Sequence, residues 1–171
     1  MDCSKILISQ YLAALTMLGQ TVSRCPDPIW DSADDKIPFW RVAYHALFYT
    51  HLYLQDSEQS FIPWNRHRKE YQFIGPVPRP PYAPPQIGIA YDRNDLLDYL
   101  TFCRQQVTER IPQVNLEAPS GFDWLPFTKL ELQLYNLRHL QQHTGELMER
   151  LGSRAGLEID WVVMEAGNEA G

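Results

Sequence analysis

The chain lacks the features that mark nucleic-acid-binding, secreted and membrane-spanning proteins. Its 171 residues carry 15 Lys and Arg against 21 Asp and Glu, so the clustered basic face that nucleic acid requires is missing. The basic run at 66–69 is too short to change this and is predicted to be a solvated loop. No apolar run reaches the ~18 residues that span a bilayer, and no signal-type segment is recognisable. We therefore expect a cytoplasmic protein with neither a nucleic-acid nor a membrane partner.

Cysteine is also scarce. The three cysteines, Cys3, Cys25 and Cys103, are odd in number and form no C-x-x-C pair. This argues against a disulfide framework and favours reduced thiols. Cys103 falls in a helical pattern and is predicted to be a small buried hydrophobe.

The common catalytic motifs are missing as well. The sequence contains no G-x-S-x-G, no glycine-rich phosphate loop and no H-E-x-x-H. A ferritin-like di-iron centre requires Glu-x-x-His on two helices. In the predicted helices the one such spacing is that of His143 and Glu146, in the reverse order. These enzyme classes therefore do not fit the chain.

What the chain does contain is four segments with helical periodicity and no β-α-β alternation. Its hydrophobic fraction of 44% and its length suit one domain over residues 1–171. The pattern predicts an all-α fold, a four-helix bundle whose second helix is apolar nearly all round and central. The four segments run from about Ser4 to Arg24, from Pro38 to Gln55, from Asp92 or Asn94 to Pro112, and from Thr128 to Ser153. Ser4 can cap the first of them.

A long proline-rich crossover joins the second and third helices. Residues 56–91 contain seven prolines, which exclude regular helix, and long connections in compact domains tend to be functional or mobile. Aromatic residues in the crossover predict that it packs against the helices; they are Phe61, Trp64, Tyr71, Phe73 and Tyr82. Residues 157–171 form a C-terminal extension, predicted to be a short strand or extended arm up to Val163 and frayed from Glu165 onward.

The most informative feature is a pair of histidines one helical turn apart, His139 and His143. Positions i and i+4 share a helix face, so two imidazoles can chelate one metal ion there. With Leu130 at 0° on a helical wheel, the apolar stripe spans about 260° to 40°, and the two histidines fall near 180° and 220°. They occupy a polar strip at the edge of that stripe, together with Asn136, Glu146 and Arg150. A solvated polar face is the alternative interpretation of this strip, and such a pair also arises by chance.

A third histidine favours the metal interpretation. His45 lies deep in the apolar second helix, where an unpartnered imidazole costs on the order of 1–3 kcal/mol. Metal coordination satisfies one ring nitrogen, and Asn136 or Glu146 is a candidate to hold the other nitrogen of a ligand. His51 points ~240° away from His45 and is predicted at the surface or in a cap-type contact, and His67 is predicted to be exposed.

Two motifs around these histidines resemble a known family. Residues 40–45 read Trp-Arg-Val-Ala-Tyr-His, a histidine in an aromatic-rich second helix. Residues 139–147 read His-Leu-Gln-Gln-His-Thr-Gly-Glu-Leu, an H-x-x-x-H followed by a small residue and Gly-Glu-Leu. This combination resembles the DinB/YfiT-like metalloprotein superfamily of damage-inducible helix-bundle proteins.

The resemblance implies a bundle in up-down-down-up order, often a homodimer. It also implies a divalent metal, commonly zinc or nickel, whose three histidine ligands carry over to His45, His139 and His143. Characterised relatives include thiol-S-transferases that use low-molecular-weight thiols and a mycothiol-dependent isomerase, and many members have no known activity. The long crossover and the C-terminal extension depart from the family pattern, so no relative's substrate is carried over.

Three functions remain open from the sequence. The first is a metal-dependent enzyme, a transferase or hydrolase that uses a small thiol or an activated water. No residue stands out as general base, and Glu146 and Tyr44 are weak candidates. The second is a non-enzymatic, stress-related protein that binds a metal, a small molecule or a partner through the crossover. In the third, the histidines are ordinary core and surface residues.

Overall fold

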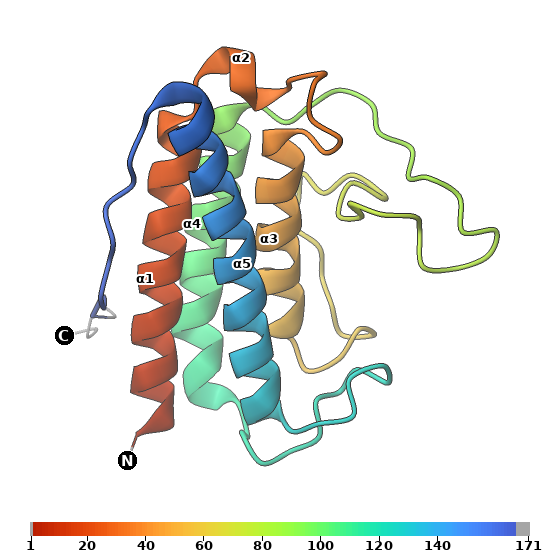
Figure 1. Cartoon of the computed structure of the whole chain (residues 1–171). Coiled ribbons are helices and arrows are strands. Elements are labelled where there is room, and N and C mark those ends of the chain that lie inside the picture. The colour runs from red at the N-terminus through yellow and green to blue at the C-terminus, as the bar shows by residue number, and fades with distance from the viewer. Residues whose placement is uncertain (1, 167–171) are drawn as a thin grey trace.

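The computed structural model describes residues 2–166 and is built from helices that pack side by side (Figure 1). No strand occurs in this part of the chain, so the all-α prediction is confirmed. Helices α1 and α5 run in one direction and α3 and α4 in the other (Figure 1). The elements are α1 (Cys3–Arg24), α2 (Asp27–Trp30), α3 (Phe39–Tyr53), α4 (Arg93–Arg110), the 3-10 turn η1 (Ile111–Gln113) and α5 (Lys129–Ala155).

Helices α1, α4 and α5 begin where a side chain accepts from unpaired backbone amides of the first turn. Asp92 caps α4 by accepting from the amide of Asp95, and Thr128 caps α5 in the same way. Asp2 caps α1, so the sequence-based choice of Ser4 as the cap is wrong by two residues; the amide of Ser4 is itself a donor to Asp2. Helix α5 ends at Gly156, whose φ of +63° is the left-handed conformation that favours glycine.

The buried face of α5 contains only part of its leucine stripe: Leu140, Leu147 and Leu151 are fully buried. Leu134 is 55% exposed, whereas Gln133 and Asn136 are fully buried. These two polar residues can be buried because they join three helices by hydrogen bonds. The Tyr11 hydroxyl of α1 donates to Gln133, and the Gln133 and Asn136 amides donate to backbone carbonyls of α3. The polar strip with the histidines therefore turns toward the core, and its interpretation as a solvated face is wrong for Asn136 and His143.

The crossover between α3 and α4 packs on the helices through aromatic side chains. Trp64 stacks on Tyr99 with 4.5 Å between ring centroids, and Tyr71 packs against Trp40. Trp64 and Tyr71 are buried, as predicted, whereas Tyr82 is 64% exposed and does not follow the prediction. The crossover thus covers Trp40 of α3 and Tyr99 of α4.

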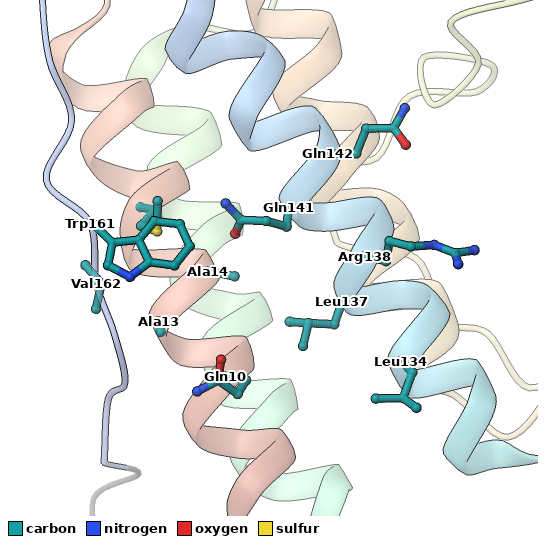
Figure 2. A pocket seen from close by; sticks show the side chains of 11 residues that line it. Gln10, Ala13, Ala14, Leu134, Leu137, Arg138, Gln141, Gln142, Trp161 and Val162 are labelled. Atoms are coloured by element: carbon teal, nitrogen blue, oxygen red, sulfur yellow. The ribbon is translucent and has the colours of Figure 1, made fainter.

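The C-terminal extension is an extended arm and not a strand. It lies along α1 (Figure 1), where Arg24 donates to the carbonyl of Glu158 and Gln10 to that of Val163. Glu165 accepts from Arg104 of α4, so the predicted fraying does not begin at this residue; 167–171 lie outside the described residues. The arm, α1 and α5 enclose a cavity of about 510 Å³, with Trp161 as one wall (Figure 2).

Helix α1 is apolar along most of its length. Contrary to the expectation from the sequence that no apolar segment is long enough, it is among the described residues the one helix long and apolar enough to cross a membrane by length and composition. In its most apolar window 56% is buried inside the protein, against α4 and α5. The core helix of a helical protein has the same character, so this feature is not evidence that α1 crosses a membrane.

Candidate metal centre

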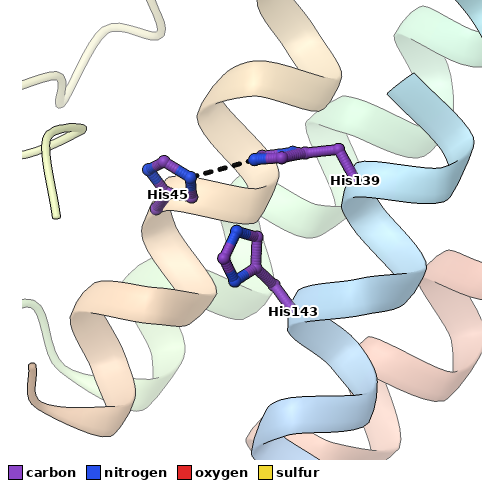
Figure 3. Close-up of side chains that lie close together, drawn as sticks. All are labelled: His45, His139 and His143. Carbon is purple, nitrogen blue, oxygen red and sulfur yellow. Dashed lines mark hydrogen bonds between the residues drawn. The ribbon is translucent and has the colours of Figure 1, made fainter. Parts of the chain in front are cut away.

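Three histidines from two helices converge at one point between α3 and α5 (Figure 3). His45 comes from α3, and His139 and His143 come from α5. One ring nitrogen from each lies within 4.8 Å of the others. The structure therefore brings together the three residues that the sequence proposes as ligands.

The helix pairing explains this convergence. His139 and His143 share one face of α5 because they are one turn apart, and their ring centroids are 4.6 Å apart. That face packs on α3, so His45 meets both rings, with centroid distances of 4.9 Å to His139 and 4.7 Å to His143. His45 and His143 are buried, whereas His139 is partly exposed, so the cluster is reached from the side of His139.

The protonation of His45 is set by the crossover. Its Nδ1 lies 2.6 Å from the carbonyl oxygen of Gln72, which can only accept, so Nδ1 carries the proton. Burial, with a smaller contribution from the neighbouring histidines, lowers the pKa of His45 to about 3. At neutral pH the ring is uncharged, and its Nε2 lone pair points at Nε2 of His139, 3.0 Å away.

His143 is oriented by a charged pair on its own helix. Its Nδ1 donates to the Glu146 carboxylate at 3.2 Å, which leaves Nε2 as the nitrogen available to a ligand. Arg150 donates to the same carboxylate and also to the carbonyl of Ile37, so Glu146 is held in place from the other side. Glu146 therefore stands in the supporting position that the sequence suggests for it.

His139 leaves one ring nitrogen unsatisfied in either neutral tautomer. Its Nδ1 is buried and has no hydrogen-bond partner among residues 2–166. With the proton on Nε2, the ring donates to His45 and Nδ1 is an unmet acceptor. With the proton on Nδ1, a buried donor is unmet and two lone pairs face each other. Burial and the adjacent His143 lower the pKa of His139 to about 4, so at neutral pH no second proton relieves this arrangement.

These observations fit a cation bound at the cluster. Metals bind the unprotonated imidazole, and each metal-bound histidine usually donates its other N–H to a carbonyl or carboxylate. His45 and His143 have such acceptors in Gln72 and Glu146. A shared cation on Nε2 also removes the conflict between the facing lone pairs of His45 and His139.

Two further residues suggested by the sequence take other positions. Tyr44 donates to or accepts from Nδ1 of His67 at 2.7 Å and stacks on Tyr91, away from the ring of His45. Asn136 donates to the carbonyl of Thr50 within the helical core. The described contacts join neither residue to the three histidines.

Sequence reasoning missed two contributors to the site. Tyr49 packs against both His45 and His139, at ring-centroid distances of 4.8 and 5.4 Å. It stands four residues after His45, so the helical spacing could have identified it. Gln72 acts through its backbone carbonyl, which no side-chain pattern reveals.

The predicted surface positions of the other two histidines are wrong. His51 is 2% exposed, because the crossover covers this part of α3 and places Phe61 against its ring. His67 is half-buried, because its ring stacks on that of Tyr44 and its Nδ1 is hydrogen-bonded to the Tyr44 hydroxyl.

Comparison with known proteins supports the resemblance of the two motifs. Residues 10–147 match the family model of the DinB superfamily, and this span contains all three histidines. No curated protein and no solved structure matches the chain significantly.

Proposed function

The chain belongs to the DinB superfamily, and from this premise we propose that His45, His139 and His143 bind one divalent metal ion, zinc or nickel. The observation that carries the proposal is the convergence of their ring nitrogens within 4.8 Å, with Nε2 of His45 unprotonated because Nδ1 carries the proton. The predicted up-down-down-up bundle supports the same assignment, because its antiparallel α3 and α5 hold the ligands from two elements.

We further propose that the protein is a metal-dependent transferase or hydrolase, with a low-molecular-weight thiol or water as nucleophile. Held by His45, His139 and His143, zinc or nickel would supply a Lewis acid that lowers the pKa of a thiol or a water.

The chain's own residues prepare the site for such chemistry. Gln72 and Glu146 hold the rings of His45 and His143 in one tautomer. Burial raises the pKa of Tyr49 to about 12, so this hydroxyl stays protonated at neutral pH. The ring of Tyr49 packs against the rings of His45 and His139 and forms one wall of the cluster. The Glu146 carboxylate contacts His143 of the cluster, and its side chain is 40% exposed to solvent.

A second candidate function is favoured by the burial of the ligands. His45 is 8% and His143 is 6% exposed, so little of the cluster is open to a substrate. A non-enzymatic, stress-related protein that binds a metal or ligand without turnover would have such a closed centre.

Metal content tests the proposed site. Untagged protein incubated with zinc or nickel and then desalted should hold about one equivalent per chain by plasma mass spectrometry. The double variant His139→Ala/His143→Ala should lose the ion while its circular dichroism stays helical. His67→Ala is the matched control, since it removes a histidine outside the cluster and should keep the ion. Equal metal content in the parent and the double variant would refute the site.

Cobalt substitution separates the two candidate functions. Co²⁺ in the site should give visible absorption bands that report its coordination. If a position is open, a small thiol such as 2-mercaptoethanol should shift these bands, and a screen of thiol and electrophile pairs is then justified. Bands that stay unchanged at saturating thiol would favour the non-enzymatic alternative.

A further inference from the structure

A second cavity lies on the opposite side of α3 from the three histidines. It measures about 560 Å³ and is formed by the end of α3, by α4 and by crossover residues 62–66. His51 lines it and is six residues after His45, which turns the two side chains ~240° apart on the helix. The volume is typical of small-molecule sites, and nothing in the proposed metal chemistry uses this cavity.

The floor of this cavity presents an unused N–H donor. Burial raises the pKa of Tyr99 well above its usual 10, so this hydroxyl keeps its proton. Among residues 2–166 its hydrogen-bond partner is Nδ1 of His51, at 3.2 Å, and donation to this nitrogen satisfies both groups. The neutral imidazole then carries its proton on Nε2. No acceptor for this N–H lies in the described part of the chain.

A guanidinium without a carboxylate partner stands beside this donor. Arg110 lines the same cavity, and its charge is near enough to His51 to help lower the pKa of that ring, chiefly a result of burial, to about 4. Arg110 donates to the side-chain oxygen of Gln106 and forms no ion pair with any described residue. The other arginine of the cavity, Arg66, is bound by Asp95 and Asp98 and is already neutralised.

The remaining walls are apolar and aromatic. Phe102 lies edge-on to His51, with 4.9 Å between ring centroids, and Trp64 is fixed by its stack on Tyr99. Ile62 also lines the cavity and is 76% exposed, an unusual position for a large aliphatic side chain. A flat or aliphatic body would therefore find apolar contacts here while its polar end reached the N–H and the guanidinium.

We propose that this cavity binds a small monocarboxylate with an aromatic or aliphatic body, its carboxylate held by Arg110 and by Nε2–H of His51. The planar guanidinium and the single N–H match the two oxygens of a carboxylate. A single uncompensated positive charge suits a monoanion, and Asp98 on the wall opposes a dianion such as phosphate. The site does not depend on metal at the three histidines.

Benzoate is the probe, followed by calorimetric titration of the full chain. Benzoate should bind, and benzamide, which has the same ring without the charge, should bind about tenfold more weakly or worse. Arg110→Gln should weaken benzoate about tenfold, whereas Arg79→Gln, an exposed arginine of the crossover, should leave it within about twofold. Circular dichroism and urea unfolding confirm that each variant is folded.

Two further measurements locate the bound carboxylate. His139→Ala/His143→Ala must retain benzoate affinity, because loss of binding there would place the carboxylate at the metal centre instead. In ¹⁵N-histidine-labelled protein the His51 ring should show the Nε2–H tautomer, and its Nε2 signal should move when benzoate is added. The proposal is overturned if benzoate gives no binding at about 10 mM, if benzamide binds equally, or if Arg110→Gln and Arg79→Gln behave alike.

Discussion

At the scale of single residues, the chemistry of the three histidines depends on what the second nitrogen of each ring contacts. His45 and His143 have fixed tautomers because a carbonyl and a carboxylate accept their Nδ1 protons. His139 has no such acceptor among the described residues, and its Nδ1 is buried. The cluster therefore has two oriented nitrogens and a third that only a bound cation would orient.

Glu146 should raise metal affinity through His143. Removing it in Glu146→Ala takes away the acceptor of the Nδ1 proton, and loss of such a partner typically weakens a metal site about 10- to 100-fold. The dissociation constant for Zn²⁺, measured by competition with a chromogenic chelator, should rise by about this factor. Glu149→Ala is the matched control, an exposed glutamate on the same helix that should change the constant little. Equal constants for both variants would contradict the assignment.

His51 should make the metal-free protein sensitive to mild acid. Its folded-state pKa is lowered to about 4 by burial, against about 6.5 in the unfolded chain. Between these values the unfolded chain takes up a proton that the folded chain refuses, so stability falls as pH falls from about 6.5 to 4. In chelator-treated protein, His51→Gln should reduce this loss of unfolding free energy by on the order of 2 kcal/mol, as measured by urea unfolding across that pH range. An unchanged pH slope in the variant would show that His51 is readily protonated in the folded state.

At the scale of elements, α5 shows what the amphipathic pattern can and cannot predict. Its start, its end and the shared face of His139 and His143 follow from caps and spacing, because these are local properties. Which face of α5 is buried does not follow from local sequence, because Gln133 and Asn136 are buried only with hydrogen-bond partners on α1 and α3. A helical wheel counts both residues as polar. The buried face that it predicts is therefore rotated about the helix axis relative to the face that is buried in the structure.

A pair of leucine variants on α5 tests which side of its leucine stripe is buried. Leu140 is fully buried, so Leu140→Ala should cost about 2–5 kcal/mol of unfolding free energy by leaving a cavity. Leu134 is 55% exposed, so Leu134→Ala should cost less than about 1 kcal/mol. Urea unfolding measures both. Equal costs would mean that the Leu134 side of the leucine stripe is part of the core as well.

The crossover limits prediction of the site in a different way. Its prolines predict an irregular segment, and its buried Trp64 and Tyr71 were identifiable as packing residues. The Gln72 carbonyl on His45 and the cover over His51 depend on the path of the backbone, which residue types in this segment do not specify. The three histidines were therefore predictable from spacing, whereas their supporting contacts and the second cavity were not.

At the scale of the whole molecule, the number of chains in the particle stays a prediction. The superfamily resemblance implies a homodimer, and light scattering after size exclusion should then give twice the 19.9 kDa chain mass. The measurement should be made with and without added zinc, because the proposed site is complete within one chain and dimer formation should not depend on metal. A mass that doubles only with zinc would mean that a metal joins two chains.

Metal binding should stabilise the whole fold, because its ligands join α3 to α5. An ion that binds the folded chain alone adds about 2.7 kcal/mol at a free concentration of 100 times its dissociation constant. For a domain of this length that should raise Tm by roughly 5–10 °C. The increase should be absent in His139→Ala/His143→Ala and present in His67→Ala. If Tm of the parent stays constant while zinc is shown to bind, the ion is not held between these two helices in the folded chain.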